Sequence, residues 1–378
     1  MMWLAAFAVG LWASPAAAAA QATHSTALYQ QFFPAWDEML KGYLEHDCQQ
    51  QITDYRNASF NNTHISYAVF GCLLEQFPEY RKAELSAAAV VLGLAPTILQ
   101  MVSPTPVDTA MVSLRRPILA LLLSLASPAT VFSEAVKYAD VIDALSKPLS
   151  RQSRRSFPYT AGRLLGGGGT RNYMSSLVSG IQYTLALAAV ANSAYRTYQL
   201  CVWTVCSFSP ITVFLPALWH GTVVLLHLGG WIALRLNLQR TDGVKKAGQG
   251  TEEHHWQGMT DGWGSRVKSL FKNETTPSAF AKKLPAESRV AGPAPFFSAV
   301  IAALYAGVPV HVLYGTLVLS SLTFISAFDS ISVVAFYAIS TIVSKAIVYF
   351  ECAGIQAVAC QTLDAANEGD EMNGYSAL

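Results

Sequence analysis

Three histidines in strongly apolar surroundings are the residues of this chain that best suit intramembrane chemistry. His220 and His227 are seven residues apart, so on a helix they project from one face, roughly 10 Å apart along the axis. His311 lies in the middle of a later apolar run. Imidazoles from neighbouring helices can bind a transition metal or haem. The spacing is too long for one shared ion and no carboxylate accompanies these histidines, so packed or hydrogen-bonded histidine is the expectation, and no cofactor is predicted.

Lys345 is a fourth ionisable residue inside an apolar run, about one turn before its end. Its long stem can carry the ammonium to the lipid headgroups. Alternatively, the ammonium pairs with Glu351 or with a helix carbonyl. Together with the three histidines, Lys345 makes up a candidate intramembrane ligand site, because ionisable groups inside spans are costly and often functional.

The composition predicts the elements that must position these residues. The 378 residues are 52% hydrophobic and 13% charged, with a mean hydropathy of +0.32, whereas soluble domains carry about a quarter charged residues. The 25 basic and 24 acidic residues leave no excess charge for binding nucleic acid. The chain is therefore expected to be a membrane protein, with the lipid bilayer as its partner.

Apolar runs long enough to cross a bilayer, about 20 residues each, predict an all-α polytopic protein with five transmembrane helices. They occupy residues 85–102, 176–194, 209–234, 296–322 and 331–350. A sixth run, 118–132, is short and contains Pro128, so it is interpreted as a re-entrant or interfacial helix. The alternative is six or seven crossings, if this run crosses the bilayer or the signal is retained.

The N-terminal segment 1–20 has the pattern of a signal peptide, with an apolar stretch, a Ser14-Pro15 break and an alanine run. A retained anchor is the alternative, because the basic residues that usually precede the apolar stretch are missing.

Residues 21–82 are predicted to form a small helical ectodomain, with helical spacing of apolar residues from Tyr29 to Leu44. Two N-x-[ST] acceptors at Asn57 and Asn61 predict glycosylation. Cys48 and Cys72 are expected to pair in an oxidising compartment, with two free structural cysteines as the alternative. Cys201 and Cys206 are candidates for a second disulfide.

Charge in the loops predicts the orientation of the chain. The segment from the short run to Tyr173 carries seven basic and three acidic residues, and 235–295 carries ten and six. By the positive-inside rule both face the cytoplasm, where they can contact anionic lipid. The N-terminus is then lumenal or extracellular, and the third acceptor, Asn273, is cytoplasmic and unglycosylated. The acidic C-terminal tail, including Glu351, is expected to be solvated.

These features divide the chain into eight parts. They are a signal peptide (1–20), an ectodomain (21–82), the first span with the short helix (83–135), a basic glycine-rich cytoplasmic loop (136–175), two spans (176–234), a second basic loop (235–295), two spans (296–350) and an acidic cytoplasmic tail (351–378).

Two stretches near the first span, Ala88–Thr97 (AAVVLGLAPT) and Leu114–Ala129 (LRRPILALLLSLASPA), carry a family resemblance. The chain here resembles a group of uncharacterised multi-pass membrane proteins of filamentous fungi. The resemblance implies no reaction, ligand or functional residue. It favours a location in a eukaryotic secretory pathway or at the plasma membrane.

The catalytic motifs H-E-x-x-H and G-x-S-x-G do not occur in the sequence, which favours a role other than catalysis. The leading hypothesis is an accessory, scaffold or receptor-like membrane protein. The alternatives are a transporter of a small solute or metal ion that uses His220, His227, His311 and Lys345, and a membrane-bound oxidoreductase or pathway enzyme.

Overall fold

The computed structural model describes residues 27–57, 64–131, 168–248, 271–280 and 295–375. The predicted signal peptide, the acceptor Asn61 and most of both basic loops lie outside these ranges.

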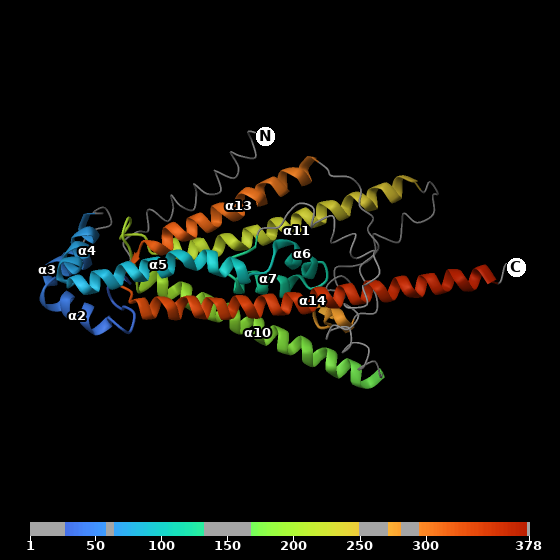
Figure 1. Ribbon diagram of the computed structural model, residues 1–378, viewed down its shortest axis with the longest axis horizontal. Helices are drawn as coiled ribbons and strands as arrows, with labels where there is room; N and C mark the ends of the chain where they lie inside the picture. The colour runs from blue at the N-terminus through green and yellow to red at the C-terminus, as the bar shows by residue number, and fades with distance from the viewer. Residues whose placement is uncertain (1–26, 58–63, 132–167, 249–270, 281–294, 376–378) are drawn as a thin grey trace. The chain divides into compact units, whose positions relative to one another are not determined.

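Within the described residues the protein is all-α, and five helices are long and apolar enough to cross a membrane (Figure 1). They are α5 (Glu79–Val102), α10 (Gly168–Val202), α11 (Leu215–Gly248), α13 (Pro295–Ser320) and α14 (Ala327–Tyr375). The prediction of an all-α integral membrane protein with five candidate spans is therefore confirmed. The third run was predicted to start at 209, but α11 begins only at Leu215, because residues 209–212 form a turn in which the Thr212 N–H donates to the Ser209 carbonyl.

The chain divides into two compact units, and each long helix contributes residues to both. Unit 1 comprises residues 1–98, 194–220 and 312–337. Unit 2 comprises residues 99–193, 221–311 and 338–378.

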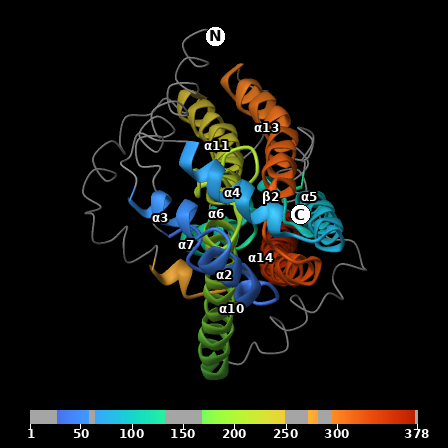
Figure 2. The same cartoon turned by 90° about the vertical axis from the view of Figure 1, so that its left-hand side faces the viewer.

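Unit 1 contains three short helices that lie together, α2 (Asp37–His46), α3 (Gln49–Asn57) and α4 (His64–Gln76) (Figure 2). They share one aromatic core with the antiparallel pair β1 (Val205–Cys206) and β2 (Leu322–Thr323). Phe324, which directly follows β2, is fully buried and its ring contacts Phe32, Phe70 and Phe77. The structure contains the Cys48–Cys72 disulfide, which joins the turn between α2 and α3 to α4.

The helix predicted from the spacing of Tyr29 to Leu44 is only half right. Residues 29–36 are not helical, and α2 begins at Asp37. Tyr29 has a φ of 64°, and the Asp37 carboxylate accepts a hydrogen bond from the Phe32 N–H at 2.9 Å. The aromatic residues of this stretch are buried, but they lie in a turn and not in a helix.

Unit 2 contains the two short helices α6 (Pro106–Ser113) and α7 (Pro117–Ala126), which pack against each other (Figure 1). Leu119 and Leu123 of α7 are fully buried against Ala186 of α10 and Ile347 of α14. The 3₁₀ helix η2 (Ser278–Phe280) also belongs to this unit. The short apolar run predicted at 118–132 thus contains a ten-residue helix, followed by non-helical chain as far as residue 131, where this described range ends.

Candidate functional site: two helix breaks and a buried charge network

Two helix breaks meet in unit 2. Helix α5 ends at Val102, two residues before Pro104. Helix α7 ends at Ala126, two residues before Pro128. Both helices end before a proline because proline has no N–H to donate the next helical hydrogen bond. The Ser103 and Ser127 hydroxyls are 3.2 Å apart. The Thr130 hydroxyl donates to the Pro104 carbonyl at 3.0 Å. We call residues 103–105 and 127–131 together the break crossing.

Side chains of the long helices satisfy carbonyl groups at the end of α7 and just after it. Ser193 of α10 donates to the Ala126 carbonyl at 2.7 Å, and Ser344 of α14 donates to the Leu123 carbonyl at 2.8 Å. His311 Nε2 of α13 donates to the Pro128 carbonyl at 3.0 Å. His311 is the sixteenth of the 25 residues of its candidate span, so this bond lies near the middle of that span. Irregular backbone at such a depth requires this kind of satisfaction, since no water is available.

The three histidines of the predicted ligand site each form a hydrogen bond with a different threonine. In unit 1, His220 Nδ1 lies 2.6 Å from the Thr197 hydroxyl, which is also 2.8 Å from the Tyr337 hydroxyl. In unit 2, His227 Nδ1 lies 2.7 Å from Thr109, and His311 Nδ1 lies 2.9 Å from Thr222.

Among the described residues, no group of three or more histidine, cysteine or acidic side chains is placed to hold a metal ion. His227 and His311 belong to unit 2, while His220 belongs to unit 1.

Lys345 of α14 contacts the end of α5. Its ammonium donates to the Met101 carbonyl at 3.4 Å, in the last turn of that helix, where carbonyls lack helical partners and the helix dipole is negative. Of the two pairings considered for Lys345, the structure thus has the helix carbonyl, whereas Glu351 is engaged by another cation.

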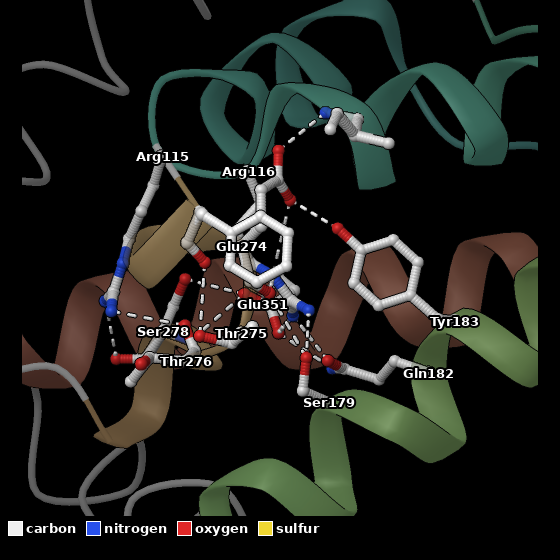
Figure 3. A network of polar contacts seen from close by, with 12 residues as sticks. Arg115, Arg116, Ser179, Gln182, Tyr183, Glu274, Thr275, Thr276, Ser278 and Glu351 are labelled. Carbon is white, nitrogen blue, oxygen red and sulfur yellow. Dashed lines mark hydrogen bonds and ion pairs between the residues drawn. The ribbon is translucent and has the colours of Figure 1, made fainter. Parts of the chain in front are cut away.

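That cation is Arg116, in the turn between α6 and α7 (Figure 3). Arg116 and Glu351 are both 0% exposed, and Arg116 Nη1 lies 2.8 Å from Glu351 Oε1. Arg116 also donates to the Ser179 hydroxyl at 2.7 Å and to the side-chain oxygen of Gln182. The Gln182 amide in turn donates to Glu351 Oε1 at 2.7 Å.

The segment 271–280 supplies the remaining members of this charge network. Glu351 Oε2 accepts from the Ser278 hydroxyl at 2.6 Å and from the Ser278 N–H at 3.1 Å. The Glu274 carboxylate accepts from the Ile118 N–H at 2.7 Å, which caps the start of α7, and from the Tyr183 hydroxyl. Glu274 thus stabilises the N-terminus of a helix distant in sequence.

Arg115 completes the network. Its guanidinium donates to the carbonyls of Thr276 at 3.2 Å and Ser278 at 3.4 Å. Burial lowers the pKa of Arg115, and the nearby Glu351 opposes this shift. Two arginines and two glutamates make the charge network neutral overall, and hydrogen bonds satisfy both buried carboxylates, as burial of charge requires.

Two predictions are corrected here. Glu351 was assigned to a solvated tail, but it is fully buried, because α14 continues beyond the apolar run and Arg116 holds the carboxylate. Cys201 and Cys206 do not form a disulfide. Both are free, and Cys206 Sγ lies 3.1 Å from the Ser321 hydroxyl.

Sequence reasoning missed the charge network because its members are far apart along the chain. Arg116 and Glu351 are separated by 235 positions. The available signals were the Arg115-Arg116 pair directly before an apolar run and Glu351 directly after another.

Comparison of the chain with protein-family models, with curated proteins and with solved structures found no match.

Proposed function

We propose that this integral membrane protein is a transporter of a small polar solute, which passes at the break crossing. The observation that supports this proposal is the meeting of two helix breaks, at the Ser103 and Ser127 hydroxyls, beside histidines of two candidate spans. Non-helical backbone inside a membrane occurs where protein buries it or where it lines a path for polar molecules. Transporters commonly place their substrate sites at such discontinuous helices.

The polar groups of the break crossing favour an uncharged solute. They are serine and threonine hydroxyls, backbone carbonyls and imidazoles. Among the described residues of unit 2, Arg116 and Glu351 neutralise each other within the charge network, and Lys345 donates to the Met101 carbonyl. A charged solute would lose far more hydration free energy than such neutral groups return.

The proposal includes the orientation derived from the loop charges. Five crossings put the two ends of the chain on opposite sides, with the helical domain of α2–α4 lumenal or extracellular and the C-terminus cytoplasmic. Asn57, exposed at the end of α3, is then glycosylated, and Asn273, exposed in the segment 271–280, is not. A glycosidase-sensitive mass shift that is lost in Asn57→Gln supports this orientation. A shift lost in Asn273→Gln contradicts it.

Transport is tested with purified protein in liposomes. The influx of water, ammonia, urea and glycerol is followed by stopped-flow light scattering or an internal pH dye. We expect at least one solute to enter several-fold faster than in protein-free liposomes. Thr130→Val, which removes the hydroxyl bonded to the Pro104 carbonyl, should reduce this rate. Thr184→Val is the matched control, because the exposed Thr184 hydroxyl bonds only within its own helix at Gly180. Rates equal to those of empty liposomes for all four solutes would contradict the proposal.

An accessory or receptor-like role is the second candidate, and the N-terminal domain supports it. The Cys48–Cys72 disulfide closes this domain. The Asp329 carboxylate, at the start of α14, accepts from the Ala35 N–H at 3.4 Å and from the Ser326 hydroxyl at 2.9 Å. A domain fixed in this way presents a constant surface to a protein partner. Absence of flux, together with a native complex larger than the 40.8 kDa chain, would favour this role.

A further inference from the structure

We infer that His227 is the solute-binding residue of the break crossing, and that its Nε2 accepts a hydrogen bond from a small uncharged donor molecule. This inference rests on the proposed transport function and adds the residue, the atom and the chemical class of the ligand.

The first observation is a buried ring nitrogen without a partner. His227 is 5% exposed, and its Nε2 has no hydrogen-bond partner among the described residues. Its other nitrogen, Nδ1, lies 2.7 Å from the hydroxyl of Thr109, in the first turn of α6 directly after the break. A buried polar atom left unpaired costs free energy, and in a native protein it calls for an explanation such as a bound ligand.

The second observation concerns the proton on this imidazole. The Thr109 hydroxyl has a single proton and lies 3.1 Å from the Pro106 carbonyl and 3.2 Å from the Thr105 carbonyl. Threonine in a helix commonly donates to such a carbonyl three or four residues earlier. The hydroxyl oxygen then accepts from His227, so Nδ1 carries the proton and Nε2 presents a bare lone pair.

His311 has the opposite arrangement, which makes the assignment specific. Its Nε2 must carry the proton, because its partner, the Pro128 carbonyl, only accepts. Its Nδ1 therefore accepts from Thr222 in the neutral ring. His311 holds the backbone of the break crossing, while His227 keeps a free acceptor.

The surrounding packing limits the size of the ligand. A Cβ on Gly230 would lie 2.7 Å from the Pro106 carbonyl oxygen, so α11 and the start of α6 touch backbone to backbone one turn beyond His227. A Cβ on Gly229 would lie 2.8 Å from the Leu304 side chain of α13. Such close approach excludes a bulky ligand from these two sides of α11. The ligand class is therefore a small neutral molecule with an N–H or O–H donor.

The tautomer is tested by nitrogen NMR on full-length protein with ¹⁵N-labelled histidine in lipid nanodiscs. The His227 signals are assigned by their loss in His227→Gln. We expect Nδ1 to be protonated and Nε2 to be unprotonated, with an Nε2 shift that moves on titration with urea or glycerol. A protonated Nε2, or an Nε2 shift that neither probe moves, would overturn the inference.

Solute entry into liposomes, measured for the wild type and for a His227 variant, shows whether this inference or the proposed transport function has failed. His227→Phe removes the acceptor and keeps a ring, and should slow solute entry on the order of tenfold, the effect of one hydrogen bond of typical strength. His46→Phe, at the exposed end of α2, is the same substitution outside unit 2 and should leave the rate unchanged. Wild-type flux that survives His227→Phe overturns the inference but leaves transport standing. If the wild type shows no flux, transport fails and the NMR titration alone decides whether His227 binds a donor.

Discussion

Removing one negative charge from the charge network should destabilise the protein strongly. Glu351→Gln keeps the shape of the side chain but replaces one acceptor oxygen by an NH₂ donor. The carboxylate accepts from four donors: Arg116 at 2.8 Å, Gln182 at 2.7 Å, and the hydroxyl and N–H of Ser278 at 2.6 and 3.1 Å. The substitution removes the nearest counter-charge of the buried Arg116, and the Glu274 carboxylate remains 4.0 Å from Arg116 Nε. Breaking one side of a buried pair costs about 3–5 kcal/mol, and we expect a loss in this range.

The assay is equilibrium unfolding in mixed detergent micelles, followed by circular dichroism. Glu79→Gln is the matched control, because Glu79 forms a surface pair with Lys82 and its side chain is 89% exposed. Such pairs contribute ~0–1 kcal/mol. The double variant Arg116→Met, Glu351→Met removes both charges together. Its loss of unfolding free energy should be much smaller than the summed losses of the single variants Arg116→Met and Glu351→Met.

This reasoning would be refuted if Glu351→Gln lowered the free energy of unfolding by no more than the Glu79→Gln control does. It would mean that Arg116 and Glu351 do not form a desolvated pair. Additive effects in the double variant would lead to the same conclusion.

Three further predictions concern other parts of the chain. Cys48→Ser removes the disulfide, whose partners are 24 positions apart, and should lower the free energy of unfolding of the N-terminal domain by ~3 kcal/mol. Thermal unfolding should then begin at a lower temperature, and adding reductant to the wild type should have the same effect. Burial raises the pKa of Tyr55 from 10.0 to about 12. Just above pH 10 only the unfolded state releases this proton, so the free energy of unfolding should fall as pH rises from 10 through 12. The fall should be shallower in Tyr55→Phe. Gly354→Ala would place a Cβ 2.5 Å from the Ala279 nitrogen and should destabilise by ~1–3 kcal/mol. Gly180→Ala is the control, because a Cβ there would have nothing within 4 Å, and it should stabilise α10 by ~1 kcal/mol. If Gly354→Ala also raised the stability, the packing of η2 on α14 would be contradicted.

The long helices were predictable because their signal is local. A run of about 20 apolar residues has few alternatives to a crossing helix, and each of the five predicted runs corresponds to a long helix. The short run was also predictable as something other than a crossing, because Pro128 ends it. The turn at residues 29–36 was not, since a turn and a helix can bury the same aromatic residues.

The polar partners could not be predicted in the same way. The sequence indicated hydrogen-bonded histidines, but Thr109 is 118 positions from His227, and nothing local points to it. The Arg116–Glu351 pair joins a turn to a helix near the other end of the chain. Such pairs depend on how the helices pack, which composition and periodicity do not specify.

The central claim is that the breaks after α5 and α7 meet, and cysteine cross-linking tests it most directly. Ser103→Cys and Ser127→Cys are introduced together after replacing Cys201, Cys206, Cys352 and Cys360 by serine, and the disulfide-linked peptides are identified by mass spectrometry in native membranes. The hydroxyls are 3.2 Å apart, so mild oxidation should join this pair rapidly. The control pair Ser113→Cys and Ser127→Cys flanks α7, a ten-residue helix roughly 15 Å long, and should not be joined. A Ser103–Ser127 pair that stays unlinked, or links no faster than the control, would contradict the claim.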